Sequence, residues 1–111
     1  MKSELVIAVR GDDAELVAVH LKAVLGLSFS AHDSSYKGDY WRHATSDGGA
    51  VEVSYNDDPM WLPGDPDEEQ FFQPKFAEFG ILVSVYGSET LAAGVLGAVK
   101  SGYSSSVVVK S

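Results

Sequence analysis

Acidic side chains concentrate in residues 57–69, a stretch that also contains three prolines and a tryptophan. Proline interrupts helix interiors and central strands, so this composition predicts an exposed loop. Grouped carboxylates repel one another, a cost that solubility does not require, and they attract cationic surfaces on other molecules. With Trp61 as an aromatic anchor, the loop is expected to bind a basic partner. Its acidic residues are Asp57, Asp58, Asp65, Asp67, Glu68 and Glu69.

The histidines offer a different kind of chemistry. His32 and Asp33 are both metal-ligating residue types, but neighbours on a strand point to opposite faces, so we expect no metal site there. His43 has the chemistry of a general base, and it would need an aspartate to orient it and a serine nucleophile. The residues available for those two roles are Asp33 or Asp39 and Ser34 or Ser35. A small enzyme that uses His32 or His43 is therefore one alternative function.

Other cofactor chemistry is not indicated. The absence of cysteine removes thiolate metal ligands and thiol nucleophiles together. The glycine pairs Gly48-Gly49 and Gly94 with Gly97 lack phosphate-loop spacing and the lysine that accompanies it. The leading expectation is a protein without cofactor, metal or enzymatic activity.

A β-hairpin precedes the acidic loop and is the best-specified local element. Glycine tolerates the positive φ of a tight turn, and alternating side chains follow on either side. Pairing Arg42 with Glu52 across the strands places both on one face and sends Trp41 and His43 inward. The expected turn is Asp47-Gly48-Gly49, and the expected arms are about residues 40–45 and 50–55.

Helix signals place two β-α-β units around this hairpin. Asp12 is the expected cap of the first helix, with Glu15 completing a capping box and Gly26 ending the helix. Ser88 is the expected cap of the second helix, whose glycines, Gly94 and Gly97, predict close packing. The aromatic residues 71–79 are expected to fold back over a core edge. The predicted strands cover about residues 4–10, 27–33, 80–86 and 103–110, and the predicted helices about residues 13–25 and 89–100.

The order β-α-β-β-β-loop-β-α-β predicts an α+β fold of the ferredoxin-like sandwich type. Its sheet is expected to be mainly antiparallel, with five to six strands and both helices on one face. The length of 111 residues fits a single domain over residues 1–111. Ferredoxin-like units often pair edge to edge and bind ligands between protomers, so a small-molecule-sensing regulatory domain is the second alternative.

Composition narrows the class of partner. The net charge of −8 and the pI of about 4.6 disfavour nucleic acid and anionic membranes as primary partners. The start of the sequence shows no apolar signal core, and the lack of cysteine fits a reducing compartment, so we expect a cytoplasmic protein. We expect a monomer or a weak dimer.

Two motifs lie in the middle of the sequence, residues 32–42 (HDSSYKGDYWR) and residues 51–57 (VEVSYND), followed by an acidic tail and an aliphatic strand. Together they resemble small acidic immunity proteins from bacterial polymorphic-toxin and contact-dependent growth inhibition systems. The resemblance covers about residues 27–86 and implies a non-enzymatic cytoplasmic protein that neutralises the C-terminal domain of a cognate toxin. Many such toxins are nucleases, whose basic groove an acidic loop can occupy. The matching positions are Tyr36, Asp39, Tyr40 and Arg42, whereas the proline-interrupted loop with Trp61 departs from the pattern.

Overall fold

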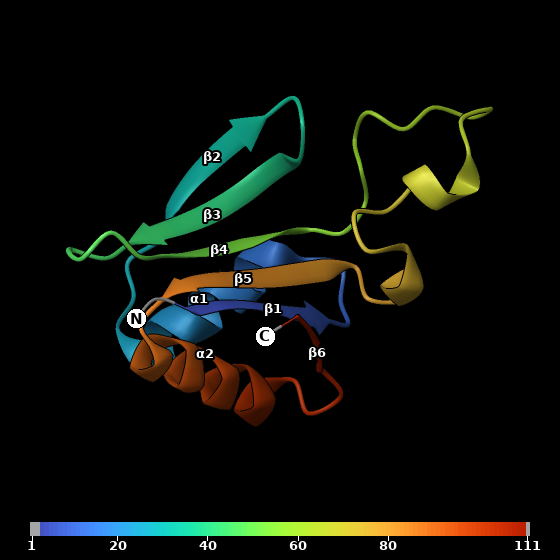
Figure 1. Ribbon diagram of the computed structural model, residues 1–111. Helices are drawn as coiled ribbons and strands as arrows, with labels where there is room; N and C mark the ends of the chain where they lie inside the picture. The colour runs from blue at the N-terminus through green and yellow to red at the C-terminus, as the bar shows by residue number, and fades with distance from the viewer. Residues whose placement is uncertain (1–2, 111) are drawn as a thin grey trace.

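The strands form one antiparallel sheet of six, in the order β2-β3-β4-β5-β1-β6, in the computed structural model, which describes residues 3–110. Two helices cover one face of this sheet, as Figure 1 shows. The α+β class and the predicted element order are therefore confirmed. The elements are β1 (Ser3–Val9), α1 (Ala14–Leu25), β2 (Ser30–Ser34), β3 (Gly38–Ala44), β4 (Ala50–Tyr55), β5 (Ile81–Gly87), α2 (Glu89–Gly102) and β6 (Val107–Lys110).

Each helix connects strands that are not neighbours in the sheet. The chain leaves β1, forms α1, builds the β2–β3 hairpin and enters β4, while β5 lies between β1 and β4. Likewise α2 connects β5 with β6 across β1. This is the split β-α-β arrangement of a ferredoxin-like fold, extended at the β4 side by two strands.

The main core lies between the sheet and the two helices. Ile7 of β1, Val83 of β5 and Val53 of β4 are fully buried, because alternate residues of each strand face the helices. Leu21 of α1 and Val95 of α2 fill the opposite side of this layer. Each such side chain contributes about 1.5–3 kcal/mol of hydrophobic stabilisation.

A smaller apolar cluster lies on the other face of the sheet. Ala8 and Leu82 pack there under Phe79, which is buried, with Phe76 beside it. Arg10 lies over the Phe79 ring, 4.5 Å from its centroid. The predicted lid is therefore confirmed for its C-terminal part, and the remainder of this face stays open.

Local predictions differ from the structure at element ends. The cap of α1 is Asp13 and not Asp12: its backbone is extended and its carboxylate accepts from the Glu15 amide (3.1 Å). Gly26 ends the helix in the predicted left-handed conformation, and Ser88 caps α2 through the Leu91 amide. The strand predicted over residues 27–33 begins at residue 30, and the one predicted over residues 103–110 begins at residue 107.

Close packing at the two interior glycines of α2 was a wrong prediction. A methyl group on Gly97 would meet no atom within 4 Å, and one on Gly94 would meet only a Leu25 methyl at an ordinary 3.9 Å. The tight approach lies at Gly102, where a methyl group would come 2.6 Å from the His20 ring. His20 Nε2 donates to the Ala98 carbonyl (2.8 Å) and so joins the two helices.

We predict that Gly80→Ala destabilises the fold while Gly97→Ala does not. A methyl group at position 80 would lie 2.4 Å from the backbone oxygen of Gly11, so the backbone must move at a cost of about 1–3 kcal/mol. At position 97 the same change meets open space and raises the free energy of unfolding by about 0.5–1 kcal/mol. Urea unfolding measures both values, and equal effects would contradict this packing.

Candidate functional site

The acidic loop is held to the sheet by a buried asparagine that immediately follows β4. Asn56 is fully buried, and its side-chain amide donates to the carbonyl oxygens of Phe76 and Phe79, both at 3.0 Å, and of Gln73 at 3.3 Å. Its side-chain oxygen accepts from the Gln73 amide (2.8 Å). Buried amides of this kind are costly unless paired, so these bonds fix where the chain returns to β5.

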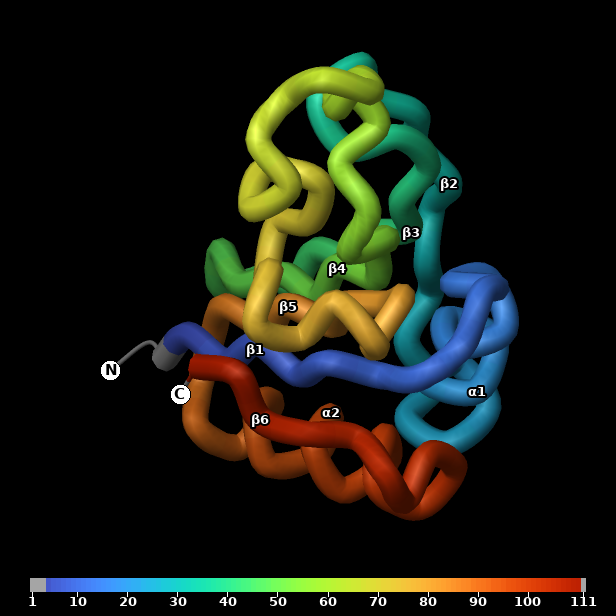
Figure 2. Tube along the Cα trace, turned by 90° about the vertical axis from the view of Figure 1, so that its right-hand side faces the viewer, coloured from blue at the N-terminus to red at the C-terminus, as the bar shows by residue number. Residues whose placement is uncertain are grey.

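Backbone hydrogen bonds extend this anchor into a narrow stem. The Phe72 amide donates to the Asn56 carbonyl (2.8 Å), and the Asp58 amide donates to the Gln70 carbonyl (2.9 Å). Asp57 and Phe71 form a bridge between these bonds. Residues 59–69 therefore project from the stem as a compact tip, away from the helices (Figures 1 and 2).

Short-range hydrogen bonds order the tip itself. Trp61 donates its indole N–H to the Pro66 carbonyl (3.0 Å) and its amide to the Asp58 carbonyl (3.1 Å). Asp58 accepts from the Met60 amide (2.9 Å), and Asp65 accepts from the Leu62 amide (3.0 Å). A 3₁₀ turn at Asp67–Glu69 then leads back to the stem.

The six carboxylates of the tip and stem have no cationic partner within residues 3–110. The ion pairs of this part of the chain all lie elsewhere, between Arg10 and Glu78, between Glu52 and both Lys37 and Arg42, and between Glu4 and Lys110. Nor do the described His, Asp and Glu residues form any group of three that could hold a metal ion. The negative charge of the loop is therefore neither neutralised internally nor arranged as a metal site.

A groove runs along the tip between its aromatic and acidic side chains. Its volume is about 460 Å³. Two of its apolar side chains are strongly exposed, Met60 at 58% and Phe72 at 40%. Large exposed apolar side chains beside charge are typical of protein-binding surfaces. The lining residues are Asp58, Met60, Trp61, Asp65, Glu69, Phe71 and Phe72.

The predicted binding residues of the hairpin divide between three places. Tyr36, 75% exposed, lies in the β2–β3 turn, and a methyl group added to Gly38, two residues further on, would lie 3.9 Å from the Pro59 ring of the loop. The turn and the loop stand at the same end of the molecule in both views (Figures 1 and 2). Tyr40 and Arg42 face the open side of the sheet, whereas Asp39 lines the opposite side with Trp41. Of these four residues, only Tyr36 therefore lies in the turn that stands at the same end of the molecule as the loop.

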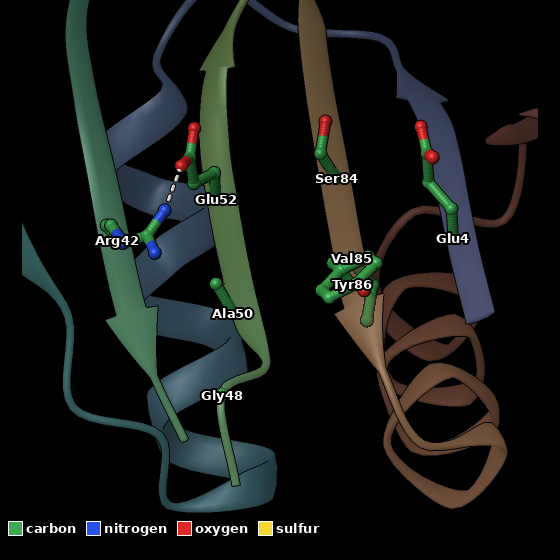
Figure 3. Close-up of a pocket in the computed structure, with 8 residues that line it drawn as sticks. All are labelled: Glu4, Arg42, Gly48, Ala50, Glu52, Ser84, Val85 and Tyr86. Carbon is green, nitrogen blue, oxygen red and sulfur yellow. Dashed lines mark hydrogen bonds and ion pairs between the residues drawn. The ribbon is translucent and has the colours of Figure 1, made fainter. Parts of the chain in front are cut away.

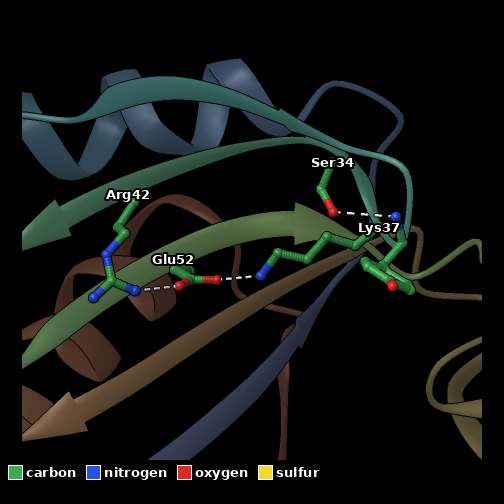
Figure 4. A network of polar contacts seen from close by, with 5 residues as sticks. Ser34, Lys37, Arg42 and Glu52 are labelled. Carbon is green, nitrogen blue, oxygen red and sulfur yellow. Dashed lines mark hydrogen bonds and ion pairs between the residues drawn. The ribbon is translucent and has the colours of Figure 1, made fainter.

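Arg42 is engaged in an ion-pair network on the open face of the sheet (Figure 4). Glu52 pairs with Lys37 through one carboxylate oxygen and with Arg42 through the other, in the predicted cross-strand register. Burial alone would raise the pKa of Glu52, but hydrogen bonds and charges from Lys37 and Arg42 hold the pKa below its usual value. Lys37 also lies 4.3 Å from the centroid of the Tyr40 ring.

A shallow hollow lies beside this network (Figure 3). Its volume is about 330 Å³, and it runs across β4 and β5. Glu4, Glu52, Ser84 and Tyr86 provide its polar groups together with Arg42. The charged groups that line the hollow, Glu4, Arg42 and Glu52, are each engaged in an ion pair, so among the described residues the hollow presents no unpaired charged side chain.

The two histidines of the enzyme alternative lie on opposite faces of the sheet. His32 stacks on Tyr40 with ring centroids 5.1 Å apart, on the open face. His43 lies toward the helices, where its Nδ1 donates to the Ser28 carbonyl (3.0 Å). Within residues 3–110 neither histidine forms a hydrogen bond with a carboxylate, so the structure does not assemble the triad that the enzyme alternative would need.

Sequence reasoning missed Asn56, Met60, Phe71 and Phe72 as parts of the site. The sequence predicts packing for the whole aromatic run, but only its later members Phe76 and Phe79 have that role. For Phe71 and Phe72, the signal available in the sequence was their position directly after the acidic residues 65–69.

We found no match between this sequence and any protein-family model or curated protein. Among the helices of residues 3–110, none combines the length and apolar character needed to cross a membrane.

We predict that Asn56→Asp releases the loop. A carboxylate cannot donate to the three carbonyl oxygens that Asn56 contacts, so the free energy of unfolding should fall by on the order of 2–4 kcal/mol. Limited proteolysis should then cut within residues 57–79. Gln70→Glu is the matched control, since the Gln70 side chain forms no hydrogen bond in the described chain; equal losses in both variants would exclude the anchoring role.

We predict that the ion-pair network makes stability fall in acid. The pKa of Glu52 is lower in the folded than in the unfolded chain, so its contribution is complete above the ordinary glutamate pKa of about 4.3 and is lost as pH falls through the folded value. Near neutral pH, Glu52→Gln should lower the free energy of unfolding by about 0.5–1 kcal/mol. Urea unfolding at several pH values should show this difference vanish in acid; a difference that grows in acid would refute the network's role.

Proposed function

We propose that this chain is an immunity protein that binds a cognate bacterial toxin domain and covers its active site or substrate groove. The observation that carries the proposal is the projecting loop, whose six carboxylates have no cationic partner within the described residues. Such a surface attracts a cationic surface on another molecule and raises the rate of encounter.

Preorganisation supports this proposal. The loop is tied at its stem by Asn56 and at its tip by Trp61, so binding does not have to order a flexible segment. The exposed Met60 and Phe72 supply apolar contact area beside the charge, as in interfaces where a few anchors carry most of the energy.

A nuclease domain is the partner class that fits this surface best. The groove of a nuclease is basic because it binds a phosphate backbone. Several carboxylates carried on one loop can take the place of phosphates in such a groove. The resemblance of residues 32–42 and 51–57 to immunity proteins points to the same class, with the toxin acting in the cytoplasm. Inhibition requires no chemistry from the bound protein, only occlusion.

A small-molecule-sensing domain is the second candidate, and the hollow on the open face favours it. Ligand-dependent shifts of the melting temperature with amino acids or nucleotides would support it. A toxin-neutralising chain should show no such shift and should protect cells that express its cognate toxin domain.

We predict that neutralising the tip slows binding to that toxin domain. Replacing Asp65, Asp67, Glu68 and Glu69 with their amides should lower the association rate constant about tenfold or more at low salt and flatten its salt dependence. Stopped-flow mixing measures both.

The matched control removes four carboxylates outside the loop: Asp12, Glu15, Asp33 and Glu89. Each is exposed and belongs to no ion pair in the described chain, so the net charge changes equally. Equal slowing in both variants would mean that the net charge, and not the loop, guides association.

A further inference from the structure

The groove of the tip is lined by both apolar side chains and carboxylates. Trp61, Phe71 and Phe72 provide three aromatic rings, and Met60 adds a flexible thioether. Asp58, Asp65 and Glu69 line the same groove. This mixed lining differs from a purely acidic cluster, because an ion held only by carboxylates needs no aromatic rings beside it.

The carboxylates retain free acceptor capacity toward the groove. Asp58 and Asp65 each use one oxygen for a backbone amide, and Glu69 forms no hydrogen bond or ion pair through its side chain within residues 3–110. Backbone bonds hold the first two carboxylates in place without neutralising them. A cation that enters the groove therefore meets fixed negative charge.

Aromatic rings beside carboxylates favour one kind of cation. The guanidinium group of arginine is planar and weakly hydrated, it stacks on aromatic faces, and it donates two parallel hydrogen bonds to a carboxylate. An ammonium group is more strongly hydrated, so moving it from water onto an aromatic surface costs more free energy. The volume of about 460 Å³ accommodates one such side chain with its aliphatic stem.

We propose that this groove receives an arginine side chain of the toxin domain. The guanidinium group stacks on the aromatic rings of the lining and pairs with Asp58, Asp65 and Glu69. The assignment rests on the proposed function, because it names the chemistry of the partner at the same loop. It makes the groove the centre of the interface and the other carboxylates its rim.

The test uses the whole chain and three short peptides, acetyl-Gly-Xaa-Gly-amide, in which Xaa is arginine, lysine or citrulline. Citrulline keeps the shape of arginine but has no charge. Titration followed by NMR at the Trp61 indole N–H and the Met60 methyl group should give saturable shifts with the arginine peptide, at dissociation constants on the order of 1 mM. Binding should be about threefold or more weaker with lysine and absent with citrulline.

Two adjacent residues provide matched variants. Glu68 and Glu69 belong to the same 3₁₀ turn, but only Glu69 lines the groove. Glu69→Gln should weaken the arginine peptide about threefold or more, and Glu68→Gln less than twofold, since an exposed charge outside the groove acts only through screened attraction. Equal effects of the two variants, or equal shifts with arginine and citrulline, would overturn the assignment.

The outcomes separate this inference from the proposed function. If the toxin domain is neutralised but the peptides do not distinguish the variants, the groove assignment is wrong and the immunity function stands. If the arginine peptide binds as expected but no toxin domain is neutralised, the groove is an arginine site and the immunity function is wrong.

Discussion

The hydrogen bonds of one buried amide determine where the acidic loop stands. Asn56 immediately follows β4 and is fully buried, and its side chain donates to carbonyl groups of the returning chain. Six like charges in a loop would otherwise favour an expanded chain that separates them. The buried amide offsets that repulsion, because releasing the loop would leave a polar group unpaired in an apolar environment.

The sheet separates two surfaces of different character. On the open face Glu52 pairs with Lys37 and Arg42, so these charged side chains have partners within the chain. At the loop the charge is not balanced, and Met60 and Phe72 are exposed beside it. A protein that only needed solubility would gain nothing from this asymmetry, whereas a protein that binds a cationic surface gains both attraction and apolar contact.

The order of strands and helices could be predicted because it follows from local patterns. Continuous apolar runs, the glycine turn of the hairpin and the cap at Ser88 each act within a few residues. Asn56 could not be predicted, since one polar residue after a strand has no local signature and its partners lie 17 to 23 residues away. The aromatic run divides for the same reason, with Phe79 buried against β1 and β5 while Phe72 is exposed. Asp12 and Asp13 are the same residue type and can cap a helix equally well. Asp13 is the cap because its backbone is extended where the chain from β1 enters the helix.

The account requires that the loop is ordered before any partner binds. Amide hydrogen exchange of the free protein measures this most directly at Phe72 and Gln73, whose N–H groups donate to the backbone and side-chain oxygens of Asn56. We expect both amides to exchange about a hundredfold or more slowly than in an unstructured peptide, together with the amides of the adjacent strand β5. Exchange at the rate of an unstructured peptide, with β5 still protected, would show that the loop is not fixed to the sheet.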